Sequence, residues 1–217
     1  KLFQDIGVPV DRLITTADAG FGLDPVIGES AGREILRSEG IQLISPNLIG
    51  VTFRYMYWLW GESERENYST IMAQVCDYMA EEFEADIIFL PHCFYSLDHK
   101  YEDDRPGADE IILKMNSRTR AHAIKQVRQL YDILSIYPLL DMIVGNRRHS
   151  LIFGAIHGVA GVGLGEIGHI KPIVEQLHLD PSLFISNMDY SYENIKNSVA
   201  TSWENRAEIV ETMNGQL

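Results

Sequence analysis

LLDMIVGNRRHSLIFGAIHGVAGVGLGEIGHIKPIVEQLH, residues 139–178, is the stretch around which the chain is organised. Its apolar run at residues 142–144 is long enough for a strand buried on both faces. Residues 150–156 are mostly apolar and predict a buried helix, and a second strand is expected at residues 159–163. Pro172 then stands where the first turn of a further helix tolerates proline. This strand–helix–strand–turn–helix order is typical of parallel α/β sheets.

Three cationic or titratable side chains, Arg147, Arg148 and His149, stand between the first strand and the first helix of this stretch. In open α/β sheets, ligands bind beyond the carboxyl ends of the strands, where a helix start adds N–H groups and a positive dipole end. Two guanidinium groups and an imidazole there suit a carboxylate or phosphate with a proton donor beside it. The alternative is a cationic surface turn with a capping histidine.

The composition limits the size of the protein and its partners. The chain has 217 residues, of which 46% are hydrophobic and 23% are charged, so it can form one domain with a sizeable core. The formal net charge is −13, and we therefore expect no nucleic-acid partner, because phosphate contacts need a basic face. No apolar run approaches the roughly 18 residues that would indicate a membrane span, and no signal peptide is visible.

The cysteines and histidines predict no metal site. Cys76 and Cys93 are in neither a CxxC nor a zinc spacing, which favours two reduced thiols in a cytoplasmic protein. The histidines show no HExxH pattern or other metal spacing. Residues 163–168 are a literal GxGxxG, but this fingerprint normally opens its domain, and here several elements precede it. We therefore expect no dinucleotide, and no other cofactor.

The rest of the chain alternates predicted helices and strands. Outside the central stretch, we expect strands at residues 13–16, 49–55, 87–90 and 183–186. We expect helices at residues 68–83, 108–115, 120–137 and 190–213, and a polar helix or linker at 26–40.

Other polar side chains near predicted strand ends have two interpretations each. Arg54 could extend the anion site or belong to an edge strand, and His92 could be functional or structural. Asp18 could be a polar group at a domain edge or an aspartate that starts a turn. Asp103 and Asp104 could bind a cation or form a solvated loop.

The central stretch resembles the polysaccharide pyruvyl transferase family. That family carries a strand, then Gly-x-Arg-x-His-(Ala/Ser), an apolar helix, a second strand and a lysine. Here the corresponding residues are Ile143-Val-Gly-Asn-Arg147-Arg-His149-Ser, the helix after them, and Lys171. ADAGFGLDP at residues 17–25 and IIFLPHC at residues 87–93 resemble two further family segments, in matching order. This chain departs from the family in having Arg148 where leucine is usual.

The resemblance implies the fold and its division. It implies an α/β, Rossmann-like parallel sheet flanked by helices, as the C-terminal half of a GT-B-like two-domain fold. Residues 1–38 would be the end of an N-terminal domain or a linker, and residues 39–189 the Rossmann-like donor-binding domain. Residues 190–217 would form a C-terminal helix. We expect this piece to be inactive alone, because the acceptor would lie in the cleft between the two halves.

The resemblance also implies a reaction. Family members transfer the pyruvyl unit of phosphoenolpyruvate to a sugar hydroxyl as a ketal, in cell-surface or exopolysaccharide biosynthesis. The partners would be phosphoenolpyruvate and a glycan or sugar acceptor, with no metal strictly required. The protein would be cytoplasmic and could form a homo-oligomer.

Site residues follow from the matching motif positions. His149 would be the general acid and base, and Arg147 would hold the carboxylate or phosphate of the donor. Arg54, which stands at the carboxyl end of a predicted strand and outside the matching motif, and Lys171 are further candidates for the same anion site, and Ser150 and His92 complete the substrate-binding set. The alternatives are a GT-B-type nucleotide-sugar glycosyltransferase, which would bind a diphosphate at the same strand ends, and a non-catalytic binding domain.

Overall fold

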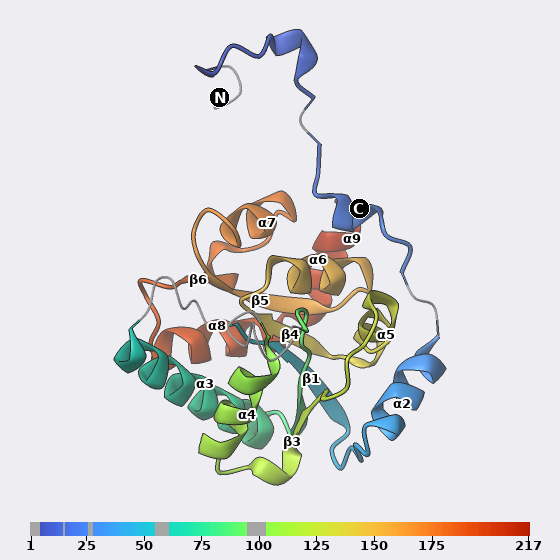
Figure 1. Ribbon diagram of the computed structural model, residues 1–217, viewed down its shortest axis with the longest axis vertical. Helices are drawn as coiled ribbons and strands as arrows, with labels where there is room; N and C mark the ends of the chain where they lie inside the picture. Colours follow the sequence, from blue (N-terminus) through green and yellow to red (C-terminus); the bar gives the residue numbers. More distant parts are fainter. Residues whose placement is uncertain (1–4, 15, 26–27, 55–60, 95–102) are drawn as a thin grey trace.

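Six parallel strands form one sheet within the residues that the computed structural model describes, which are 5–14, 16–25, 28–54, 61–94 and 103–217 (Figure 1). The strands are β1 (Asn47–Thr52), β2 (Ala85–Phe89), β3 (Ala121–Ala123), β4 (Met142–Gly145), β5 (Ala160–Gly165) and β6 (Phe184–Ser186). Their order in the sheet is β3-β2-β1-β4-β5-β6. The predicted Rossmann-like parallel sheet is confirmed.

The order of the strands sets the position of a crevice. From β1 the chain moves outward through β2 to β3, and then returns to β4 beside β1 before moving outward on the other side. In such a doubly wound sheet, ligands bind where the winding reverses, outside the carboxyl ends of the strands. Here the reversal lies between β1 and β4, whose register places Thr52 beside Gly145.

Helices cover both faces of the sheet. They are α2 (Glu29–Ser38), α3 (Glu62–Glu82), α4 (Arg105–Lys114), α5 (Leu130–Leu134), α6 (Arg148–Ile156), α7 (Lys171–Gln176), α8 (Tyr192–Glu204) and α9 (Arg206–Asn214). On one face α3 and α8 lie side by side, while α6 packs on β4 and β5 from the other face (Figure 1). Among the described residues, no helix combines the length and the apolar character needed to span a bilayer.

The centre of the sheet is the core of the protein. Every residue of β2, β4 and β5 is buried, because helices cover both faces. Side chains such as Ile49, Ile87 and Val144 are completely inaccessible to solvent, and each contributes about 1.5–3 kcal/mol of hydrophobic stabilisation. This two-sided burial explains why the strands read as continuous apolar runs.

Most of the predicted elements are present, but the helix predicted at residues 120–137 is wrong. That region forms the edge strand β3, a loop and the short helix α5. Its apolar residues suggested a helical stripe, yet Ala123 pairs with Phe89 in the sheet, and Val127 and Tyr131 are exposed. Tertiary pairing at a sheet edge has overridden a local periodicity.

Two further predictions are corrected. The single helix expected at residues 190–213 is divided at Asn205 into α8 and α9, and the Asn205 side-chain amide donates to the carbonyl of Thr201. Side-chain competition of this kind is a common way to end a helix. The strand expected at residues 13–16 is absent from the described part of that segment, where a 3₁₀ turn, Val10–Arg12, is followed by extended chain.

Candidate functional site

Two loops meet at the crevice between β1 and β4, and Asn146 holds them together. The backbone N–H of Arg54 donates to Asn146 Oδ1 over 2.8 Å, and Asn146 Nδ2 donates to the Arg54 carbonyl over 2.7 Å. This pair of hydrogen bonds fixes the chain after β1 against the chain after β4. Arg54 and Arg147, predicted for one anion site, are thereby brought to the same crevice.

The start of α6 is fixed by hydrogen bonds from Ser150 to the Arg147 carbonyl. Arg147 is the N-cap residue, with φ −104° and ψ 121°, and the Ser150 hydroxyl donates to the Arg147 carbonyl over 2.5 Å. Ser150 is completely buried beneath the site and lines neither cavity described below. Its position supports the N-terminal turn of α6 and provides no contact surface for a substrate.

Asp104 holds the Arg147 side chain from the β2 side of the crevice. A guanidinium nitrogen of Arg147 lies 2.5 Å from Asp104 Oδ1, and the side chains are only 14% and 3% exposed. The other oxygen of Asp104 accepts the backbone N–H groups of His92 and Cys93. Burial raises the pKa of Asp104, and Arg147 opposes that rise. One buried carboxylate therefore joins the loop after β2 to the start of α6.

Asp18 holds the other two side chains of the motif. Its carboxylate lies 3.0 Å from a guanidinium nitrogen of Arg148 and 3.6 Å from His149 Nε2. It also accepts the backbone N–H of Gly20 over 2.9 Å, which makes it the N-cap of the 3₁₀ helix Ala19–Gly22. That hydrogen bond lowers the pKa of Asp18, burial opposes this, and Arg148 and His149 lower the pKa further. The segment before the sheet is thus attached to α6.

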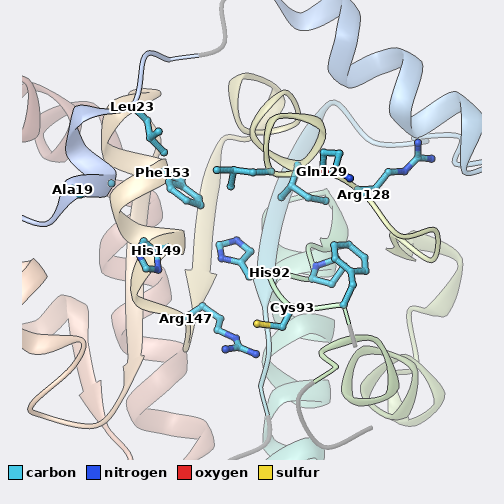
Figure 2. A pocket seen from close by; sticks show the side chains of 14 residues that line it. Ala19, Leu23, His92, Cys93, Arg128, Gln129, Arg147, His149 and Phe153 are labelled. Atoms are coloured by element: carbon cyan, nitrogen blue, oxygen red, sulfur yellow. The ribbon is translucent and has the colours of Figure 1, made fainter. Parts of the chain in front are cut away.

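Two cavities meet at Arg147 and His149, which line both. The smaller has a volume of about 310 Å³, and its described lining residues are Arg54, Asn146, Arg147, Arg148, His149, Gly165, Glu166, His169 and Ile170. The larger has a volume of about 490 Å³, and Figure 2 shows His92, His149 and Phe153 around it, with Arg147 beside them. His149 is 46% exposed, so its imidazole is open to solvent and ligand.

His92 is placed as a neutral structural group in the wall of the larger cavity. Its Nε2 lies 3.0 Å from the hydroxyl of Tyr137, and its ring contacts Phe153. Burial lowers the pKa of His92 to about 3, and Arg147 and His149 lower it as well. His92 is therefore uncharged near neutral pH and can exchange only hydrogen bonds with a ligand.

The structure thus brings four of the six predicted site residues to the crevice. Arg147 and His149 line both cavities, Arg54 lines the smaller one and His92 the larger. Lys171 is the first residue of α7 and lines neither cavity; its Nζ lies 3.5 Å from Glu175 Oε1. We therefore leave Lys171 out of the site, as we do Ser150.

Sequence reasoning missed the partners of these residues. Neither a cation site nor a solvated loop, the two interpretations of Asp103 and Asp104, describes their contacts: Asp104 pairs with Arg147, and Asp103 pairs with Arg105. Among the described residues, no group of three or more His, Cys, Asp or Glu side chains is arranged to hold a metal ion. Asn146 carried no signal beyond its position after a strand.

The family model for polysaccharide pyruvyl transferase matches residues 1–166 of the chain. The chain belongs to the polysaccharide pyruvyl transferase family. The matched region includes β1 to β5 and the motif residues Arg147, Arg148 and His149. This pyruvyl transferase family member matches no curated protein at a significant level.

Solved structures share the fold of this family member at low sequence identity. ADP-heptose lipopolysaccharide heptosyltransferase II from E. coli aligns with a TM-score of 0.58 and 13% identity, covering 84% of this chain and 54% of that one. A UDP-GlcNAc 2-epimerase from Methanocaldococcus jannaschii gives 0.52 and 15%, covering 82% and 43%. The chain therefore spans about half the length of these proteins.

A third structure matches over nearly its whole length. The C-terminal domain of a glycosyl transferase group 1 family protein from Francisella tularensis aligns with a TM-score of 0.54 and 12% identity, covering 93% of this chain and 96% of that domain. These likenesses show the fold alone. They confirm the prediction of a Rossmann-like α/β sheet, and the glycosyltransferases among them have a similar fold.

Proposed function

We propose that this family member transfers the pyruvyl unit of phosphoenolpyruvate to a sugar diol as a ketal, in the biosynthesis of a cell-surface or exopolysaccharide. The observation that carries the proposal is that Arg147 and His149, at the start of α6 beside the crevice between β1 and β4, line the same two cavities. The family match supports a transferase, and the geometry supports a small anionic donor.

The smaller cavity suits phosphoenolpyruvate in charge and size. Three guanidinium groups, from Arg54, Arg147 and Arg148, line a volume of about 310 Å³. Phosphoenolpyruvate carries close to three negative charges on a few atoms, and guanidinium groups bind phosphate and carboxylate in a bidentate manner. The N-terminal turn of α6 adds N–H groups and the positive end of a helix dipole.

Ketal formation assigns two proton transfers to the imidazole of His149. The imidazole gives a proton to the terminal enol carbon, so that the C=C bond becomes C–C and positive charge develops at the carbon bearing the phosphate. One sugar hydroxyl adds to that carbon and returns a proton to the imidazole. The C–O bond to phosphate then breaks, phosphate leaves with the electron pair, and the second hydroxyl adds and loses its proton to the departing phosphate. A positioned imidazole can exchange protons near neutral pH.

The proposal extends to location and assembly. Cys76 and Cys93 form no disulfide among the described residues, as expected in the cytoplasm, where phosphoenolpyruvate is produced. We propose a cytoplasmic enzyme in which a second domain completes the acceptor-binding site. The enzyme could act as a homo-oligomer. We also propose that residues 39–189 are the donor-binding domain, preceded by the end of an N-terminal domain or a linker and followed by a C-terminal helical segment.

Replacing His149 tests the mechanism. His149→Asn keeps a polar side chain at the second position of α6 but cannot exchange the proton, so transfer, assayed in a protein that contains both halves of the fold, should fall at least ~100-fold. Binding of phosphoenolpyruvate, measured by calorimetry, should change only a few-fold. His178→Asn is the matched control, because His178 is exposed and lines neither cavity at the crevice. Near-normal transfer by His149→Asn would refute the role of the imidazole.

Ligand-induced stabilisation separates this proposal from the alternative glycosyltransferase function. Phosphoenolpyruvate should raise the melting temperature of the protein, because binding to the folded state alone stabilises it. UDP- and GDP-sugars at the same concentrations should have little effect, because the donor cavity of about 310 Å³ cannot hold a sugar nucleotide unless the ligand extends into the larger cavity, whose wall is mostly apolar. Stabilisation by a sugar nucleotide without stabilisation by phosphoenolpyruvate would favour the alternative.

A further inference from the structure

The two cavities that share His149 differ in electrostatic character. The smaller one has three arginines on its wall, and Glu166 is the single carboxylate among its described lining residues. The larger one shares Arg147 and His149 with it but adds only one other charged residue among those described, which is Arg128. The charges on the wall of the larger cavity therefore decide which ligand it can hold.

Buried carboxylates neutralise the arginines on the wall of the larger cavity. A guanidinium nitrogen of Arg128 lies 2.7 Å from Glu39, and both side chains are largely buried. Arg147 is paired with the buried Asp104, and His92 is uncharged near neutral pH. Among the described residues, both arginines that line this cavity are thus paired with carboxylates, and the shared His149 faces Asp18.

The remaining wall of the larger cavity is mostly apolar. The apolar residues that line it are Ala19, Leu23, Pro91, Phe94, Leu130, Ile133 and Phe153. The ring centroids of His149 and Phe153 lie 5.6 Å apart, so the apolar wall extends to the imidazole. Small-molecule sites are typically apolar with a few placed polar groups, so this wall suits an organic ring better than a compact anion.

We propose that the larger cavity is the acceptor subsite and takes a neutral sugar ring that carries a free diol. The inference rests on the proposed function, in which the donor fills the cavity of the three arginines. An acceptor in the larger cavity would lay its C–H face against Phe153 and Leu130 and reach His149 from the side opposite to the donor. Acidic sugars would be disfavoured, because Arg128 and Arg147 on this wall are each paired with a buried carboxylate, and the cavity lacks the additional arginines, Arg54 and Arg148, that line the donor cavity.

Narrowing the larger cavity tests the assignment. Leu130 is 47% exposed at its rim, so Leu130→Trp can narrow the cavity with little cost to the fold. Binding of a neutral methyl hexoside, followed by ligand-observed NMR on the whole chain, should weaken at least ~10-fold. The dissociation constant of phosphoenolpyruvate, from calorimetry, should stay within about two-fold. Leu113→Trp is the matched control, because Leu113 is 66% exposed and lines neither cavity.

Comparison with a charged sugar provides a second test of the assignment. The wild-type protein should bind the methyl hexoside more tightly than the corresponding methyl hexuronide, and Leu130→Lys should reverse or abolish that preference. Unchanged hexoside binding by Leu130→Trp, or weaker phosphoenolpyruvate binding with hexoside binding intact, would overturn the assignment of the two cavities. A wild-type protein that binds hexoside but no phosphoenolpyruvate would instead refute the proposed function, and the assignment would fall with it.

Discussion

At the residue scale, two carboxylates hold the cations of the site, and they do so differently. Asp104 is buried, pairs with Arg147 and accepts two backbone N–H groups, so it cannot be removed without leaving a buried cation unpaired. Asp18 lies nearer the surface and faces Arg148 and His149. Because Asp18 lies 3.6 Å from the proposed proton donor, we propose that it positions the imidazole.

Asp18→Asn should therefore lower activity more than stability. The amide can still accept the N–H of Gly20, but it removes the charge that faces His149 and Arg148. We expect kcat/KM for transfer to fall roughly 10-fold, with less than about 1 kcal/mol lost from the free energy of unfolding, because Arg148 is partly exposed.

The control for this substitution is Asp180→Asn. Asp180 caps the 3₁₀ helix Pro181–Leu183 in the same way that Asp18 caps its own, and no described cation pairs with it. Kinetic assays with urea unfolding of both variants separate the two effects. Equal losses of activity in the two variants would contradict a positioning role for Asp18.

The lowered pKa of His92 predicts a pH dependence of stability. The pKa is about 3 in the folded protein against 6.5 for an unperturbed histidine, chiefly because of burial. Between these values the unfolded chain binds a proton that the folded chain does not, so stability must fall as the pH falls through this window. One such group contributes a slope of at most ~1.4 kcal/mol per pH unit.

His92→Gln should remove this contribution. Its free energy of unfolding, relative to the wild type, should improve as the pH is lowered from near neutral to about 4.5. Urea unfolding at several pH values measures the difference, with His178→Gln as an exposed histidine control. A difference between wild type and His92→Gln that stays constant with pH would show that His92 titrates normally.

The two residues to which we assign the chemistry were predictable from sequence, whereas their partners were not. Arg147 and His149 could be found because they stand between a strand and a helix, where ligands bind in this class of fold. Asp104 contacts Arg147 across 43 residues of sequence, and Asn146 contacts Arg54 across 92. Such contacts depend on which strands become neighbours, and no local pattern encodes that.

At the scale of elements, the close approach of α6 to the end of β4 requires a glycine. A Cβ atom at Gly145 would overlap the hydroxyl oxygens of Thr52 and Ser150, which lie on β1 and α6. The absence of a side chain thus allows three elements to meet at the crevice. Strands such as β4 were predictable because they are buried on both faces, while β3 is a short edge strand with little signal of its own.

Gly145→Ala should therefore destabilise the protein. Overpacking of this kind typically costs about 1–3 kcal/mol of unfolding free energy, and it should also displace Arg147 and weaken phosphoenolpyruvate binding. Gly22→Ala is the control, because a Cβ atom at Gly22 meets nothing within 4 Å. Chemical denaturation and calorimetry provide the two readouts, and equal stability of the two variants would show that the crevice can relax around the methyl group.

At the scale of the whole molecule, the C-terminal helices support the sheet from beyond the region matched by the family model. α8 lies against α3 and β5, and Ile195 and Val199 of α8 are completely buried. Residues 167–217 therefore contribute to the same core as the matched residues. Their separation into two helices was not predictable from apolar spacing, because both helices keep an apolar side toward the core.

Ile195→Ala should cost about 2–5 kcal/mol of unfolding free energy, because it leaves a cavity between α8 and the core. Leu113→Ala, at a position that is 66% exposed, should cost far less. Denaturant midpoints of the two variants provide the comparison. A small effect of Ile195→Ala would mean that α8 is only loosely attached to the sheet.

The reversal of winding between β1 and β4 has a consequence for the order of folding. Arg54 and Arg147 reach the same crevice only when β4 pairs with β1. In the sequence β4 follows β2 and β3, which lie on the opposite side of β1. Pairing between distant strands is slow, because the loop that joins them must be closed before any contact compensates the lost entropy. The affinity for an anion should therefore be absent from a nascent chain that ends before β4 and should be acquired late, together with the last central strand.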